Sequence, residues 1–162
     1  MVDAQNLHPV LHPTCEEIQI VFPCLYLITT LSTDSPSISP KRYFVVVYEV
    51  DEGEFENYIL VNPKIVSYSD EKIYLPGGEG CLSVDREVSG LIHRARRITV
   101  DTYLYNPEDG TLSKEVLRLK NYPALVFQHE YDHLNGILFV DRINKNNPFE
   151  VVANSTPIKF SS

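Results

Sequence analysis

The chain has 162 residues, of which 43% are hydrophobic and 22% are charged, and its formal net charge is −8. This composition is typical of a globular protein, and the length suits a single domain over residues 1–162 with a sizeable core. The acidic balance argues against direct nucleic-acid binding, because such proteins need a basic face to neutralise phosphates.

The beginning of the chain differs in character from the rest. Residues 1–40 contain no glycine and form an atypical N-terminal segment. The most apolar part of this segment, Ile18–Leu31, follows Glu16 and Glu17 instead of a basic leader, and Pro23 interrupts it. Because this stretch is too short to span a bilayer, we expect a buried strand or a packed loop and no membrane contact.

The middle of the chain has the pattern of a series of strands. Residues Tyr43–Val50 are rich in β-branched and aromatic side chains and predict one strand. Residues Tyr58–Val66 predict a second strand, with an irregularity at Pro63. Further on, Arg97–Leu104 alternates cleanly between apolar and polar residues, and Glu115–Lys120 closes a hairpin with it.

Helix signals appear only after these strands. Asn121 can cap a helix, Pro123 suits its first turn, and Gly136 suits its end. A run of strands followed by one helix indicates an α+β fold, with antiparallel and mixed β-sheets around a central helix.

The predicted helix carries the pattern H-E-x-x-H. His129 and His133 are one turn apart, so both imidazoles can reach one metal ion from the same face. Glu130 lies about 100° around the helix from His129, where it can contact a water molecule at the metal without being a ligand. The alternative is a pair of core histidines beside a surface glutamate. The spacing favours the metal site.

A catalytic metal normally has three protein ligands, and His133 is the last histidine of the chain. Glu150 is one candidate for the third ligand, on the C-terminal side. Cys81 is the other, beside the glycine cluster Gly77–Gly80, where the backbone can approach a ligand closely. A lone cysteine is more often a small buried hydrophobe, but this setting favours Cys81 as a ligand.

The remaining cysteines are Cys15 and Cys24. With Cys81 they make an odd number at irregular spacing, which is not the pattern of a secreted disulfide framework. We therefore expect a reducing compartment and a cytoplasmic location.

Two segments together resemble the second and third signature motifs of peptide deformylases. They are Glu79–Ser83, with the sequence EGCLS, and Gln128–Gly136, with the sequence QHEYDHLNG. This family removes the formyl group from the N-terminal formyl-methionine of newly made proteins. The resemblance extends from Tyr58 to Ile143, and the run Val84–Arg86 is similar to the Gram-positive subclass.

The resemblance implies a set of roles. Cys81, His129 and His133 would bind one divalent metal, ferrous iron first, with zinc, nickel or cobalt as alternatives. Glu130 would take a proton from the attacking water and pass it to the leaving amine. The backbone N–H of Leu82 would donate to the developing oxyanion.

The resemblance also implies contacts beyond the metal. Glu79 and Gly80 would bind substrate, and Arg94 and Asp132 are either supports of the metal ligands or surface ion-pair residues. The expected partners are N-formyl-methionyl nascent peptides near the ribosome. We expect a monomer that contacts neither nucleic acid nor membrane directly.

The N-terminal segment departs from the family pattern. Deformylases carry a first motif just before the strand that matches Tyr43–Val50. Its glutamine amide holds the formyl oxygen, and its glycines let the backbone pair with the substrate peptide. This chain has no glycine before Gly53, its early glutamines Gln5 and Gln19 lie in another context, and Val21–Pro40 matches no known pattern.

Three hypotheses follow from these observations. The first is an active, metal-dependent peptide deformylase. The second is a catalytically weak or silent deformylase-like protein that binds metal or peptide, because the first motif is missing. The third is an unrelated H-E-x-x-H metalloprotease that uses Glu150 as its third ligand.

Overall fold

The computed structural model describes residues 43–51, 54–81, 83–106 and 109–159, and within 44–51 and 54–58 it describes the backbone only. The predictions for residues 1–40, including Ile18–Leu31, and for Leu82 fall outside these residues.

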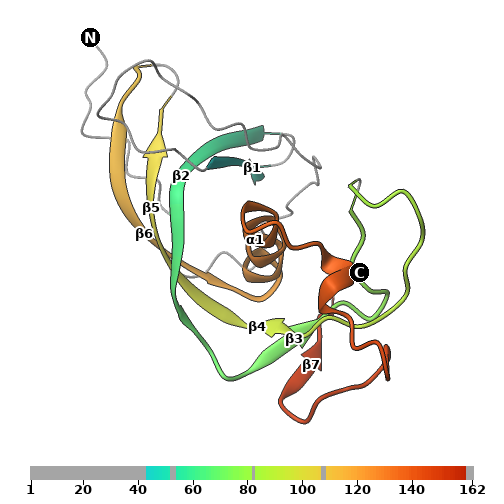
Figure 1. Cartoon of the computed structure of the whole chain (residues 1–162). Helices are drawn as coiled ribbons and strands as arrows, with labels where there is room; N and C mark the ends of the chain where they lie inside the picture. The colour runs from blue at the N-terminus through green and yellow to red at the C-terminus, as the bar shows by residue number, and fades with distance from the viewer. Residues whose placement is uncertain (1–42, 52–53, 82, 107–108, 160–162) are drawn as a thin grey trace.

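Strands and one central helix make up the fold. In chain order the elements are β1 (Tyr43–Asp51), β2 (Glu54–Tyr68), β3 (Lys72–Tyr74), β4 (Arg94–Ala95), β5 (Arg97–Tyr105), β6 (Leu112–Lys120), α1 (Asn121–Leu134), the 3-10 helix η1 (Phe139–Arg142) and β7 (Ser155–Pro157). The predicted α+β fold is confirmed (Figure 1). No helix within the described ranges is long and apolar enough to cross a membrane.

The larger sheet is antiparallel, in the order β1-β2-β5-β6, and all four of its strands were predicted. β2 is longer than predicted, and its register with β5 shifts between Val61 and Lys64. This shift coincides with Pro63, which has no N–H to donate, and with Asn62, whose φ is +51°. The predicted irregularity is therefore confirmed.

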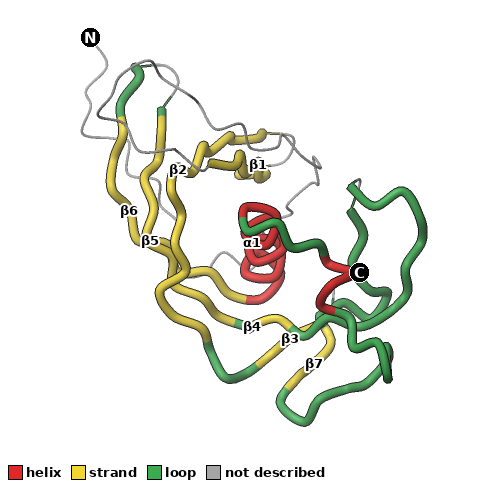
Figure 2. The backbone as a smooth tube through the Cα atoms, viewed as in Figure 1, coloured by secondary structure: helices red, strands yellow, loops and turns green. Residues whose placement is uncertain are grey.

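The smaller sheet has the order β4-β3-β7, and its last pair is parallel. Its strands are two or three residues long, and none of them was predicted. Strands this short carry no measurable alternation, so their pairing depends on the rest of the fold. Together the two sheets surround α1 (Figure 2).

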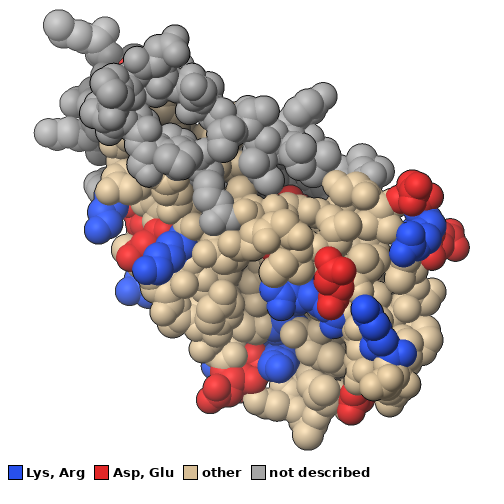
Figure 3. All heavy atoms as spheres, in the orientation of Figure 1, with Lys and Arg blue, Asp and Glu red and all other residues tan. Residues whose placement is uncertain are grey.

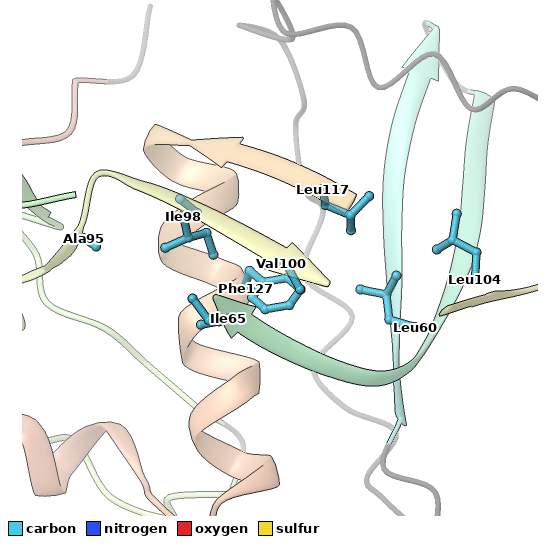
Figure 4. Packing of buried hydrophobic residues seen from close by; sticks show 9 residues of the cluster. Leu60, Ile65, Ala95, Ile98, Val100, Leu104, Leu117 and Phe127 are labelled. Atoms are coloured by element: carbon cyan, nitrogen blue, oxygen red, sulfur yellow. The ribbon is translucent and has the colours of Figure 1, made fainter. Parts of the chain in front are cut away.

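The main core lies between the larger sheet and α1. Phe127 of α1 packs in one cluster with Leu60, Val100, Leu104 and Leu117 of the strands, as Figure 4 shows. Val100 is completely buried. The alternation that predicted β5 therefore places its apolar side chains against the helix that carries the histidines.

The start of α1 differs from the prediction. Asn121 does not cap the helix: Lys120 is the N-cap residue, its side chain makes no capping hydrogen bond, and Asn121 has a left-handed φ of +56°. The Asn121 Oδ1 accepts a hydrogen bond from Arg96 Nε at 3.0 Å, and the Asn121 N–H donates to the Arg96 carbonyl oxygen at 2.8 Å. Because β6 continues into α1 without a loop, one left-handed residue makes the turn.

The other helix signals are confirmed. Pro123 lies in the first turn of α1, and Gly136 follows the C-cap residue Asn135 with a φ of +69°. The Gly136 N–H donates to the carbonyl oxygen of His133 at 3.0 Å. A glycine with positive φ thus ends the helix within one turn of the second histidine.

The left-handed conformation of Asn121 can be tested by substitution. We expect Asn121→Ala to unfold more easily than Asn121→Gly by about 1 kcal/mol, because only glycine adopts this conformation without a steric cost. Urea unfolding of the two variants measures the difference. Since both variants lose the bond to Arg96, equal stability would contradict the assigned conformation.

Candidate metal centre

Helix α1 and the loop after β3 bring three ligand groups together. The imidazoles of His129 and His133 have centroids 5.0 Å apart, with planes at 70°. Cys81 Sγ lies 3.3 Å from His133 Nε2, and one ligand atom from each of the three residues lies within 4.8 Å of the others. One thiolate and two imidazoles at this spacing fit a divalent ion such as zinc or iron, and leave a further position for a reactant.

Glu79 fixes the orientation of the first histidine. Its Oε2 lies 2.8 Å from His129 Nδ1, so this nitrogen donates its hydrogen to the carboxylate. In a neutral imidazole with this hydrogen bond, the remaining nitrogen, Nε2, carries no proton and is available to a metal. A carboxylate behind a ligating histidine is a common arrangement in metal sites.

Arg94 joins Glu79 to the helix. Its Nε and Nη2 donate to the two carboxylate oxygens of Glu79 at 2.6 and 2.8 Å, and its Nη1 donates to Asp132 Oδ2 at 2.8 Å. Arg94 and Asp132 are each only 4% exposed. They are therefore buried supports of the site, and the alternative of a surface ion pair is wrong.

The charges of this group set the ionisation of its carboxyls. Burial alone would raise the pKa of Glu79, but hydrogen bonds from Arg94 and His129, together with their charges, outweigh burial and lower it. Burial would likewise raise the pKa of Asp132, and the bonds from Arg142 and Arg94 lower it. Both carboxyls therefore stay ionised as partners of the buried arginine.

For His133 and Glu130, burial is the main influence on the pKa and favours the uncharged form of each side chain. Burial lowers the pKa of His133, and the charge of His129 lowers it further, which favours the neutral imidazole that binds metals. Burial raises the pKa of Glu130 above its ordinary value, although the charges of His129 and Arg94 act in the other direction. A raised pKa makes a glutamate a stronger base than an ordinary glutamate, which suits a residue that takes up protons.

The helix is also fixed to the neighbouring strand at this turn. The side chain of Gln128 behaves like a strand partner of β4: its Oε1 accepts from the Ala95 N–H at 3.0 Å, and its Nε2 donates to the Ala95 carbonyl oxygen at 2.9 Å. The residue before His129 therefore satisfies backbone groups at the edge of the smaller sheet.

In the loop that carries Cys81, one of the preceding glycines has a conformation that requires glycine. Gly78 has a φ of +79°, and an added Cβ would approach the Gly90 carbonyl oxygen to 3.0 Å. The Sγ of Cys81 accepts the Ser83 N–H at 3.4 Å. Gly78 thus allows two parts of the loop to approach closely, and the Ser83 N–H places a donor beside the sulfur.

The remaining predicted residues differ in their settings. Gly80 is exposed, and nothing lies within 4 Å of an added Cβ, so its backbone is accessible. Both oxygens of the Glu79 carboxylate are hydrogen-bonded to Arg94 or His129. The backbone of Glu79 is therefore the part that can contact a substrate. Glu150 is not part of the group, since its Oε2 accepts from Asn144 Nδ2 at 2.7 Å.

Comparison with known proteins agrees with this geometry. The family model for polypeptide deformylase matches residues 38–149. The chain belongs to the polypeptide deformylase family. Its Cys81–His129–His133 group is a metal site typical of deformylases.

Individual deformylases show the extent of the similarity. Peptide deformylase 2 of Bacillus cereus is 48% identical over 126 residues, which are 77% of this chain and 66% of that protein. The peptide deformylase of Staphylococcus epidermidis is 50% identical over 118 residues, 72% of this chain and 62% of that protein. The chain therefore spans less than two thirds of the length of these relatives. Their Gram-positive sources confirm the predicted subclass.

Two solved deformylase structures share the fold. A probable peptide deformylase from Synechococcus phage S-SSM7 has a TM-score of 0.52 and 39% identity, over 63% of this chain and 64% of that chain. Peptide deformylase 1B of Arabidopsis thaliana, in complex with an inhibitor, has a TM-score of 0.51 and 35% identity, over 63% of this chain and 53% of that chain.

The identity of the third ligand gives a direct prediction. We expect Cys81→Ala to purify with less than about a tenth of the wild-type metal, because two imidazoles alone hold a divalent ion weakly. Glu150→Ala, the matched control at the alternative ligand, should keep the full amount. Metal analysis by mass spectrometry measures both, and metal loss in the Glu150 variant instead would contradict the assignment.

The buried arginine gives a second prediction. We expect Arg94→Met to lower the free energy of unfolding by about 3–5 kcal/mol, because Glu79 and Asp132 would stay buried without their cation. The control is Arg97→Met, since Arg97 pairs with Glu71 at the surface, where such pairs contribute about 0–1 kcal/mol. Denaturant unfolding without metal measures both losses. Equal losses would show that the Arg94 pairs are no stronger than the surface pair.

Proposed function

We propose that this chain is a metal-dependent peptide deformylase, which hydrolyses the N-formyl group from formyl-methionine at the N-terminus of newly made proteins. The observation that supports this most strongly is the convergence of Cys81, His129 and His133, with Glu130 beside them, in a chain of the deformylase family.

Each residue has a proposed role in this reaction. Cys81, His129 and His133 would hold a divalent ion, ferrous iron first with zinc, nickel or cobalt as alternatives, and this ion would supply Lewis acidity. Glu130 takes a proton from the attacking water and delivers it to the nitrogen of the leaving amine. The backbone N–H of Leu82 donates to the oxygen of the formyl group as it gains negative charge.

The substrate lies along the loop that carries the cysteine. The exposed backbone of Gly80 is accessible to an extended peptide, and the backbone of Glu79 adds a neighbouring polar group. Both residues remain proposed substrate contacts.

The partners follow from this substrate. N-formyl-methionyl chains are made in the cytoplasm, so we place the protein there, as a monomer near the ribosome. We propose no direct contact with ribosomal RNA. On the face drawn in Figure 3, the described Lys and Arg side chains are interspersed with Asp and Glu, which does not favour a phosphate backbone.

A second candidate is a catalytically weak or silent deformylase-like protein that binds metal or peptide. It is favoured by the missing first motif, since residues 1–52 contain no glycine and the early glutamines Gln5 and Gln19 lie outside the motif pattern. Loss of one donor to an oxyanion typically costs about 10²–10³-fold in rate. The metal site can therefore persist while turnover falls.

Turnover separates the two candidates. We expect the protein, purified without oxygen and loaded with ferrous iron, to deformylate formyl-Met-Ala-Ser. Glu130→Ala should keep its iron and lose about 10²–10⁴-fold in kcat, because it removes the proton carrier and no ligand. Glu150→Ala is the matched control and should keep full turnover. Bound iron without turnover in the wild-type protein would favour the silent candidate.

A further inference from the structure

The 3-10 helix η1 contacts α1 at the turn that carries the metal ligands. The ring of Phe139, at the start of η1, stacks with the imidazole of His129 at a centroid distance of 6.2 Å and an angle of 20°. At the end of η1, Arg142 reaches Asp132, which lies on α1 directly before His133. One short element therefore contacts the helix at His129 and at Asp132, the residue before His133.

The contact of Arg142 with Asp132 uses two donors. Its Nε donates to Asp132 Oδ2 at 2.6 Å, and its Nη2 donates to Asp132 Oδ1. The same Oδ2 also accepts from Arg94, whereas Oδ1 accepts from Arg142. Two guanidinium groups thus share one buried carboxylate.

These bonds extend a chain of alternating charges to the metal site. It runs from Arg142 to Asp132, then to Arg94, then to Glu79, and ends at the Nδ1 of His129. The side chains of Asp132, Arg94 and Glu79 are at most 6% exposed, whereas that of Arg142 is 44% exposed. Arg142 is the end of the chain that faces solvent.

Removal of Arg142 would leave Asp132 with Arg94 as its remaining cation. The Asp132 carboxylate would then lack the donor at Oδ1, and a buried oxygen without a donor is costly. It can recover a donor by drawing the guanidinium of Arg94 towards itself. Any such shift weakens the two bonds from Arg94 to Glu79, which is the group that orients His129.

We propose that Arg142 is a positioning residue for the metal centre. It anchors Asp132, so that Arg94 keeps both bonds to Glu79 and Glu79 keeps His129 Nε2 directed to the metal. The inference rests on the metal site of the proposed function, not on deformylation. Substitution of groups that support metal ligands typically changes metal affinity by about 10–100-fold, and we expect a change of this size.

The test measures metal release from the full chain. The wild-type protein, Arg142→Met, Arg142→Lys and the surface control Arg97→Met are loaded with cobalt(II). A chelator is added, and loss of the thiolate-to-cobalt absorbance gives the release rate. We expect release about 10–100-fold faster for Arg142→Met. Arg142→Lys should lie between that variant and the wild type, since lysine keeps the charge without the two-pronged contact. Arg97→Met should match the wild type.

A purely structural role for Arg142 would give a different result. Arg142→Met would then lower the unfolding midpoint of the metal-free protein but release cobalt at the wild-type rate, and this outcome would overturn the proposal. If Arg142→Met does not fold, Arg142→Gln is judged by the same criterion. Because no step uses turnover, failure of the deformylase reaction would not be mistaken for failure of this inference.

Discussion

The buried guanidinium of Arg94 is the constraint on which the rest of the site depends. A buried arginine needs carboxylate partners, because an isolated charge in the interior is strongly unfavourable. Its partners are Glu79, two residues before Cys81 in the cysteine loop, and Asp132, between the two histidines of α1. Among the described residues, every buried side-chain nitrogen or oxygen has a hydrogen-bond partner. Pairing the charges therefore also brings the three metal ligands together.

The sheets provide a rigid setting for this pairing. Phe127 packs into the core beneath the larger sheet, and the neighbouring Gln128 bonds to the backbone of Ala95 in the smaller sheet. Two consecutive residues thus fix α1 to both sheets directly before His129. Catalytic groups held on a packed element keep their geometry better than groups on a loop. The sulfur of Cys81 comes from a loop, and that loop is tied to the helix through Glu79.

Local patterns predicted what depends on local physics. Alternation revealed the long strands, and the spacing of His129 and His133 revealed two ligands, because both follow from the geometry of one element. Asn121 was misassigned as a cap, since sequence does not show that a strand continues directly into the helix. The bonds of Arg94 to Glu79 and Asp132 join residues 15 and 38 positions apart, and no local pattern encodes them. The contact of Arg142 with Asp132 was missed for the same reason.

X-ray absorption spectroscopy at the metal edge tests the central claim most directly, because it reports the atoms bound to the ion. For the zinc form, the account predicts one sulfur neighbour at about 2.3 Å and two imidazole nitrogens at about 2.0–2.1 Å. The sulfur signal should disappear in Cys81→Ala. A wild-type spectrum without sulfur, or with imidazole scattering from fewer than two rings, would contradict a centre built from Cys81, His129 and His133.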